Sequence, residues 1–223
     1  MLASQTVENY LKTIYLAQTA LGSSKDLVQM GQIAAALGVV PGTATTMVKT
    51  LAESGLVRYE PYVGVRLTPS GEKLASLVLR RHRLIELFLV KVLGMSWADV
   101  HDEAEQLEHA VSERLIDRID EMLGRPDVDP HGDPIPTAQG KVARQDHPDL
   151  MTAPIGRPLV VARILDQDPS FLRFAEQRGL IPGRALRIES RDADADAVAL
   201  TSDAVGTTTI GARAASKVLV RPA

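Results

Sequence analysis

Residues 26–68 constrain the fold most, because two helix-forming stretches there are followed at once by two strand-forming ones. Residues 26–37 place Ile33, Ala34 and Leu37 at helical spacing and end at Gly38, since glycine adopts the left-handed backbone of a helix terminus at little cost. Pro41 opens the next stretch, PGTATTMVKTLAESG, and proline is favoured in a first helical turn. Two helices joined by a short glycine-containing turn are typical of a helix-turn-helix.

A β-hairpin is predicted directly after this pair of helices. Residues 56–60 and 65–68 are rich in β-branched and aromatic side chains, and Pro61 and Gly64 bound the turn between them. Thr68 can cap the following helix, with Pro69 just inside it. With a further helix at 7–21, residues 1–70 are predicted to form a winged helix-turn-helix, a fold that reads duplex DNA.

The predicted DNA-contacting side chains lie on the exposed face of the third helix and on the hairpin. Threonine hydroxyls can reach phosphates or base edges, and Thr43 lies near a helix N-terminus, where backbone N–H groups attract phosphate. The predicted set is Pro41, Thr43, Thr45, Thr46, Lys49, Arg58, Tyr62 and Arg66. The alternative is that these residues form an ordinary solvated face.

Charge is distributed unevenly along the 223-residue chain. The net charge of −3 by itself argues against DNA binding, because phosphate contacts require Lys and Arg. Residues 1–70, however, hold five basic and four acidic side chains, whereas residues 71–124 hold seven basic and eleven acidic ones. The acidic middle region therefore indicates a cationic partner.

The remainder of the chain predicts two further structured regions. Residues 69–93 and 97–123 have the spacing of two long helices with wide apolar faces, which suits a homodimer interface. Residues 125–158 are rich in Pro, Gly and Asp and are expected to be a connector. Residues 159–223 alternate short strands with one helix near 170–177, as in a small β-barrel. The predicted class is mainly α with small β parts, in domains 1–70, 71–124 and 159–223.

Histidines and carboxylates recur at helical spacing in the acidic region. His82 and Glu86 are four residues apart and share a helix face. The second predicted helix carries a similar stripe of His101, Glu105, Glu108 and His109. Imidazole and carboxylate together suit Mn(II), Fe(II), Co(II), Ni(II) or Zn(II), although such pairs also occur on solvated helices without a metal.

Enzymatic and membrane functions find little support. The chain has no cysteine, and Asp102 after His101 breaks the HExxH pattern of zinc proteases. Gln106 stands where di-iron bundles need a glutamate three residues before His109. No apolar run has membrane length, and the N-terminus lacks the features of a signal peptide. We therefore expect a cytoplasmic protein that is not an enzyme and has no membrane partner.

Several of these segments together resemble the diphtheria-toxin-repressor family of iron- and manganese-dependent repressors. The resemblance rests on TVENYLKTIY, GQIAAALGVVPGTATTMVKTLAESGLV, LTPSGEKLA, RHRLIE, VHDEAEQLEH and DPHGDPIP, and it covers nearly the whole chain. It implies a winged helix, a helical metal-binding and dimerisation domain, and a C-terminal SH3-like barrel.

The resemblance also implies two metal sites. The primary site would use Glu105, Glu108 and His109 with Asn9 from the first helix, and the ancillary site would use His82, Glu86 and His101 with a barrel residue from the stretch 166–168. Members of the manganese type carry a carboxylate at position 105, so Glu105 favours Mn(II). Asn9 replaces a methionine or aspartate and should weaken the primary site, and Lys12 stands where some members have a second acid.

The resulting interpretation is a homodimeric repressor, activated by Mn(II) or Fe(II), that binds a palindromic operator of metal-uptake genes. Other divalent transition metals are expected to bind in vitro. Two alternatives stay open at this stage. One is a winged-helix regulator that senses a small organic ligand, and the other is a metal-binding protein with a vestigial DNA-binding module.

Overall fold

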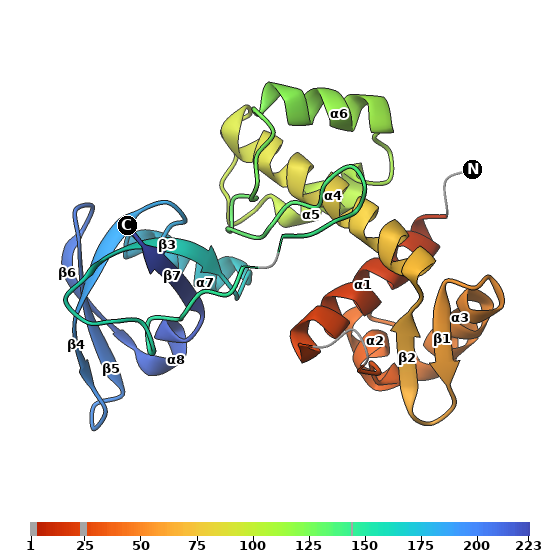
Figure 1. The fold of residues 1–223 in the computed structure, drawn as a ribbon, viewed down its shortest axis with the longest axis horizontal. Helices are drawn as coiled ribbons and strands as arrows, with labels where there is room; N and C mark the ends of the chain where they lie inside the picture. The colour runs from red at the N-terminus through yellow and green to blue at the C-terminus, as the bar shows by residue number, and fades with distance from the viewer. Residues whose placement is uncertain (1–3, 23–25, 144) are drawn as a thin grey trace. The chain divides into compact units, whose positions relative to one another are not determined.

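The computed structural model describes residues 4–22, 26–143 and 145–223, and the chain divides into two compact units. The first unit runs to His82 and also takes in Pro136–Val142. The second unit consists of Arg83–Ile135 and Ala143–Ala223. Figure 1 labels the helices and strands of both units.

The first unit is a winged helix. It contains α1 (Gln5–Leu21), α2 (Met30–Ala36), α3 (Pro41–Glu53), β1 (Val57–Glu60), β2 (Gly64–Leu67) and the first part of α4 (Pro69–Lys91). Helices α2 and α3 meet at 108°, an angle typical of a helix-turn-helix. Leu11, Ile33 and Leu51 are fully buried in the core that these elements share. The predicted winged helix is therefore confirmed.

Helix α2 is shorter than the predicted helix over residues 26–37. Val28 instead pairs with Val65 of β2 as an antiparallel bridge, with N–O distances of 2.8 and 2.9 Å. A Cβ on Gly64 would lie 2.6 Å from the Val28 carbonyl oxygen, so the close approach of these two segments requires glycine. The residues before Met30 therefore form this backbone pairing in place of a helical turn, and the pairing adds a short third segment beside β2.

The helical part of the second unit packs around the second half of α4. Helices α5 (His101–Leu107) and α6 (Glu113–Met122) share a core with α4 that includes Leu84, Ile85 and Ile116. The single helix predicted over residues 97–123 is wrong. Ser112 has an extended backbone, and its hydroxyl accepts a hydrogen bond from Leu115 N at 3.3 Å, so it starts a new helix after a turn.

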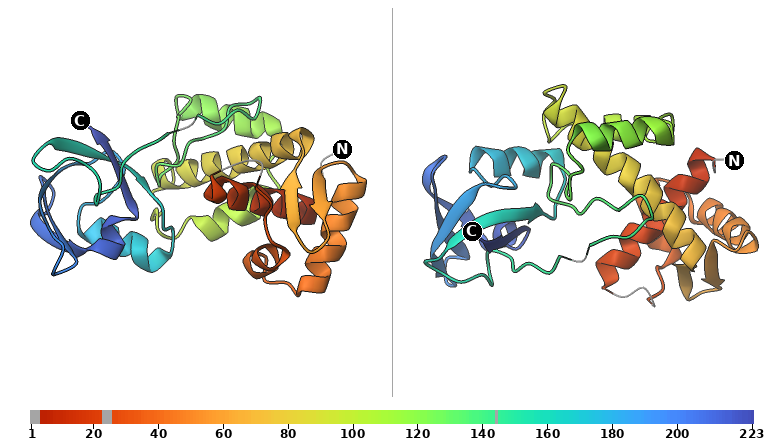
Figure 2. Two further views of the ribbon diagram at one scale, coloured as in Figure 1. Left: turned by 60° about the horizontal axis from the view of Figure 1, so that its bottom comes forward. Right: turned by 45° about the horizontal axis from the view of Figure 1, so that its top comes forward.

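The C-terminal part of the second unit is a five-stranded antiparallel sheet that curls around its own core (Figure 2). The strands are β3 (Pro158–Ile164), β4 (Ala185–Asp192), β5 (Ala197–Ser202), β6 (Gly206–Gly211) and β7 (Val218–Pro222), in the order β6-β5-β4-β3-β7. Helix α7 (Pro169–Gln177) and the single turn α8 (Ala212–Ala215) complete it. The predicted small β-barrel is confirmed, and Trp97 packs into the same core.

Hydropathy gives no single membrane-spanning helix among the described residues. Only α2 and α3 together reach the required length and composition, across their 108° bend, and both pack into the core of the winged helix.

Candidate metal centre and nucleic-acid interface

The middle of α4 carries polar side chains into the protein interior. His82, Arg83 and Glu86 are only 5%, 7% and 1% exposed. A buried charge is costly unless it is paired or binds a metal, so these side chains require partners. His82 lies one helical turn before Glu86 on the same helix, as the spacing predicts.

His101, the first residue of α5, lies between two carboxylates. Its Nδ1 is 3.4 Å from Glu86 Oε1, and its Nε2 is 3.7 Å from Glu105 Oε1. Three residues that the family resemblance places in two different metal sites are therefore neighbours. His101 is half exposed, Glu105 is one-third exposed and Glu86 is buried, so the group extends from the surface to the interior.

Two further residues, Asp129 and His131, join Glu86 in the interior. His131 Nδ1 lies 3.8 Å from Glu86 Oε2 and 4.0 Å from Asp129 Oδ1, and all three side chains are buried. Ligands that bind one transition-metal ion at about 2.1 Å lie at most about 4.2 Å apart, so both distances fit a shared ion. Asp129 and His131 were absent from the predicted site.

The hydrogen bonding of His131 supports a metal-ligand role. Its Nε2 is 2.8 Å from the carbonyl oxygen of Trp97. Because a carbonyl only accepts hydrogen bonds, Nε2 is the donor, and Nδ1 is the ring nitrogen that lies beside the two carboxylates. Within the described part of the chain, Nδ1 has no hydrogen-bond partner. Metal-binding histidines are commonly oriented by such a hydrogen bond from the other ring nitrogen.

The loop that supplies these ligands is shaped by its own sequence, DPHGDPIP. Asp129 Oδ1 accepts hydrogen bonds from the backbone N–H groups of His131 at 2.8 Å and Asp133 at 2.9 Å, which closes a tight turn. Gly132 has a φ of +88°, and a Cβ there would lie 2.0 Å from the Ala162 carbonyl oxygen. The predicted connector is therefore a buried, tightly packed loop at this point, and 131–136 are all buried.

Burial and neighbouring carboxylates disturb the electrostatics of the cluster. Burial, together with the nearby Asp133 and Glu86, raises the pKa of Asp129 well above its usual range. Arg83 opposes this rise only in part, with its Nε 3.5 Å from Asp129 Oδ2. A divalent cation would stabilise the ionised carboxylate and displace its proton.

The remaining predicted ligands of the primary site lie around the end of α5. Glu108 is fully buried, and its Oε1 is 3.3 Å from His109 Nε2. Helix α5 ends at Leu107, so both residues belong to the following turn and not to the continuous helical stripe that was expected. Glu105 lies on α5.

Asn9 and the barrel candidates complete the predicted ligands. Asn9 lies on α1 of the first unit, where its buried Oδ1 has no hydrogen-bond partner among the described residues. In the barrel, Asp166 pairs with Lys217, which lowers the pKa of this carboxyl, and Asp168 caps α7. The Gln167 amide donates to Asp133, so the barrel contacts the 129–136 loop through an amide.

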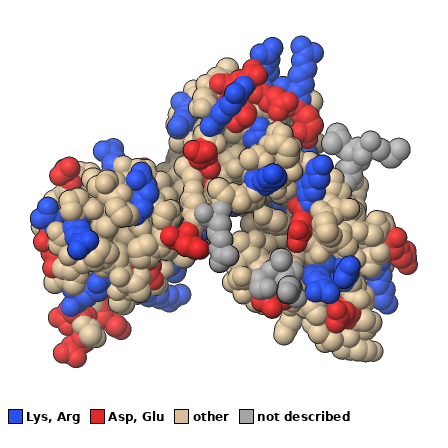
Figure 3. All heavy atoms as spheres, viewed as in Figure 1, with Lys and Arg blue, Asp and Glu red and all other residues tan. Residues whose placement is uncertain are grey.

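The acidic side chains of α6 form a different kind of region. Figure 3 shows charges of both signs on the surface over this helix. Arg118 and Glu121, for example, form an exposed ion pair at 2.9 Å. These acids lie on a solvated helix face, outside the candidate metal centre.

The predicted DNA-contacting residues of α3 lie at the start of the helix and along its surface. Pro41, Thr43, Thr46 and Lys49 are exposed, and Thr45 is half-buried. The hydroxyls of Thr45 and Thr46 donate to the carbonyls of Pro41 and Gly42, so each methyl group, and not the hydroxyl proton, is available for base contacts.

The wing presents two arginines opposite each other. Arg58 of β1 pairs in register with Arg66 of β2, and like charges in such a pair are unfavourable unless an anion neutralises them. Tyr62 at the turn is fully exposed and has a φ of 66°. These side chains suit contact with a phosphate backbone and remain predicted DNA-binding residues.

Three family descriptions match successive parts of the chain. The N-terminal DNA binding domain of iron dependent repressors matches residues 2–65. The metal binding and dimerisation domain of the same repressors matches residues 68–137. The FeoA domain matches residues 149–222, which contain the five-stranded barrel.

Individual relatives and solved structures agree with these matches. Iron-dependent repressor IdeR of Mycobacterium leprae is 31% identical over 211 residues, which cover 84% of this chain and 85% of the relative. HTH-type transcriptional regulator MntR of Lysinibacillus sphaericus is 36% identical over 118 residues, 53% of this chain and 81% of the relative. A solved "manganese-dependent transcriptional repressor complex with manganese" is 42% identical, with a TM-score of 0.84 over 97% of this chain and 100% of that chain.

The resemblance to the diphtheria-toxin-repressor family is thereby confirmed. The winged helix, the buried cluster of carboxylates and imidazoles, and the C-terminal barrel occur in the order that the resemblance implies. Relatives of this family are transcriptional regulators. The chain belongs to the iron-dependent repressor family of metal-dependent, DNA-binding transcriptional repressors.

Proposed function

We propose that this chain is a repressor whose operator binding depends on a divalent transition metal held in the second unit. The observation that carries the proposal is the position of His131 Nδ1, which has no hydrogen-bond partner among the described residues and lies beside two buried carboxylates, Glu86 and Asp129. Two carboxylates and an imidazole in this arrangement form a donor set that suits a divalent cation. The chain would then act as a regulator and not as an enzyme. It would act in the cytoplasm, where the operator DNA is accessible.

Two sets of residues would hold metal. The first comprises Glu86, Asp129 and His131, with His101 and His82 beside Glu86 as further donors. The second comprises Glu105, Glu108 and His109, with Asn9 as the first-unit candidate. When bound, the metal supplies a divalent charge that neutralises the carboxylates and links the residues it binds. Oxygen and imidazole donors without sulfur favour Mn(II), with Fe(II) as the alternative.

The DNA partner is proposed to be a palindromic operator bound by a homodimer. The matched family model for residues 68–137 is described as a dimerisation domain, and Leu107, Leu115 and Met122 are exposed apolar side chains of that region. A two-fold dimer presents two α3 helices to half-sites about one DNA turn apart, or a multiple of it. The regulated genes would serve metal uptake.

A DNA-binding titration tests the proposal. An operator is selected from random duplexes with the full chain and Mn(II), and its binding is measured by anisotropy against Mn(II), anaerobic Fe(II) and Zn(II). We expect Asp129→Asn, Glu105→Ala and Glu108→Ala each to raise the Mn(II) concentration needed by at least about tenfold. The matched control is Glu121→Ala on α6, which should respond normally.

Three outcomes would contradict the proposal in different ways. Operator binding that a chelator leaves unchanged would favour a regulator of the organic-ligand type. Absence of sequence-selective binding at every metal concentration would favour a vestigial DNA-binding module. A normal response of both Glu105→Ala and Glu108→Ala would remove the second ligand set.

A further inference from the structure

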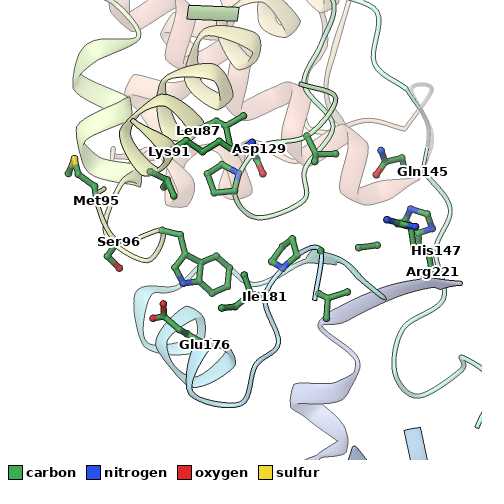
Figure 4. Close-up of a pocket in the computed structure, with 18 of the residues that line it drawn as sticks. Leu87, Lys91, Met95, Ser96, Asp129, Gln145, His147, Glu176, Ile181 and Arg221 are labelled. Atoms are coloured by element: carbon green, nitrogen blue, oxygen red, sulfur yellow. The ribbon is translucent and has the colours of Figure 1, made fainter. Parts of the chain in front are cut away.

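A cleft of about 840 Å³ lies within the second unit, beside the metal-ligand loop (Figure 4). It is bounded by the end of α4 and the loop after it, by the connector, and by β3, β7 and α7 of the barrel. Its apolar lining residues include Leu87, Val90, Met95, Trp97, Val161 and Ile181. Cavities of about 300–1,000 Å³ with mainly apolar walls are typical of small-molecule sites.

The polar lining of the cleft includes three basic residues besides Ser96 and Gln145. Lys91, His147 and Arg221 line it, and Figure 4 shows His147 and Arg221 next to each other. Two acidic residues also line it, but Asp129 is already engaged by Arg83 and by two backbone N–H groups. This leaves Glu176 as the acidic counterpart of three basic residues.

The indole N–H of Trp97 is an independent observation that points to a ligand in this cleft. The residue is 7% exposed and lines the cleft, and its buried indole N–H meets no acceptor among the residues that the structure describes. A buried donor without an acceptor is unfavourable and rare in folded proteins. An oxygen atom of a bound molecule would satisfy it.

We propose that this cleft binds an amphipathic organic anion, such as a carboxylate on an apolar chain or ring. The apolar body would cover the walls formed by Leu87, Trp97 and Ile181. The anionic head would be stabilised by Arg221, His147 or Lys91. Asp129 belongs both to the cleft and to the metal-ligand cluster, so, on the basis of the proposed function, the occupant would be a second chemical input next to the metal.

Trp97 makes the proposal measurable, because it is the chain's single tryptophan. The full metal-free chain is titrated with decanoate below its micelle concentration, and Trp97 emission and calorimetric heat are followed together. We expect saturable binding by both readouts. Octanoate should bind about tenfold more weakly than decanoate, since it buries two fewer methylene groups. Decanol and decyltrimethylammonium should also bind at least about tenfold more weakly, because they lack the negative charge.

Two variants localise the binding, and one serves as control. Ala162→Leu fills part of the cleft and should weaken decanoate binding by about tenfold, and Arg221→Gln should weaken it by about threefold. Arg213→Gln, an exposed barrel arginine outside the cleft, should bind decanoate normally.

Absence of saturable binding by decanoate would overturn the proposal. Equal binding of decanoate, decanol and decyltrimethylammonium would also overturn it, because the site would then be merely apolar. Retention of full affinity in Ala162→Leu would place the binding elsewhere and contradict the assignment to this cleft.

Discussion

The wing and the metal-ligand cluster both hold like charges close together, but in opposite surroundings. In the wing, Arg58 and Arg66 face each other across an antiparallel hairpin, near the surface. In the cluster, Glu86 and Asp129 lie in the interior, near a third carboxylate, Asp133. Each arrangement suits a partner of opposite charge, an anion in one case and a cation in the other.

The difference lies in what happens when the partner is absent. Water and salt reach the exposed Arg58 and screen it from Arg66, so the repulsion between them is worth less than about 1 kcal/mol. The buried carboxylates have no such screening, and the pKa of Asp129 rises instead. The wing can therefore exist without DNA at little cost, whereas the cluster changes its protonation when metal is absent.

The largest expected effect follows from the tight loop that holds the cluster. Gly132→Ala adds a Cβ 2.0 Å from a backbone carbonyl oxygen at a residue with a φ of +88°. We expect the free energy of unfolding to fall by about 3 kcal/mol or more, from steric overlap and left-handed strain together. Urea denaturation of the metal-free chain measures this loss.

Gly124, which follows α6, is the matched control. It has a similar φ of +78°, but a Cβ there meets no atom within 4 Å. Gly124→Ala should therefore cost only about 1 kcal/mol, from backbone strain alone. Equal losses in the two variants would show that packing of the 129–136 loop contributes nothing.

The second prediction concerns the pH dependence of the metal-free chain. Asp129 keeps its proton in the folded state at pH values where the unfolded chain, with its ordinary pKa of 3.8, has lost it. Folding thus becomes less favourable as pH rises from the unfolded pKa to the folded one, by up to about 1.4 kcal/mol per pH unit. Asp129→Asn removes this contribution and keeps an oxygen for the two backbone hydrogen bonds.

The free energies of unfolding of Asp129→Asn and of the parent chain are compared from pH 4 to pH 8. As pH rises, the free energy of unfolding of Asp129→Asn should increase relative to that of the parent chain. A difference that stays constant over this range would contradict a raised pKa in Asp129. With saturating Mn(II), the parent chain should become more stable than Asp129→Asn, because only the parent chain has the Asp129 carboxylate to bind the ion.

Much of this architecture could be predicted from periodicity and turn residues, and the failures have identifiable causes. Gly38, Pro41 and the hairpin turn locate the winged helix because they act locally. Ser112 interrupts an apolar helical pattern that continues on both sides, and only its extended backbone shows the break. The 26–29 stretch has helical spacing but pairs with Val65, a contact that local spacing cannot reveal.

Helical spacing pointed to the candidate-site residues that lie on or directly after helices. Glu86, His101 and Glu105 follow helical spacing, and the structure brings them together. Asp129 and His131 lie in a loop without periodicity, so spacing could not identify them. The signal was the DPHGDP composition itself, in which an acid and a histidine stand two residues apart around a proline, in a tract that is otherwise merely turn-forming.

The third prediction tests the second ligand set through Asn9. Asn9→Asp adds a negative charge to a side chain whose buried oxygen has no hydrogen-bond partner among the described residues. If this oxygen is a metal ligand, Mn(II) should bind roughly tenfold more tightly, because affinity rises with ligand charge. Calorimetric Mn(II) titration measures the change, and Asn9→Leu should weaken binding. Unchanged affinity in both variants would remove Asn9 from the ligand set.

The smallest expected effect belongs to Arg58, the exposed arginine of the pair in the wing. Arg58→Gln should weaken operator and random duplex DNA about equally, by roughly threefold to tenfold, and should lower the slope of log affinity against log salt by about 1. The same change should leave the free energy of unfolding within about 0.5 kcal/mol, because it relieves only a screened repulsion with Arg66. A loss confined to the operator would instead make Arg58 a base-reading residue. A clear gain in stability would show that the wing is as sensitive to its missing partner as the buried carboxylates are.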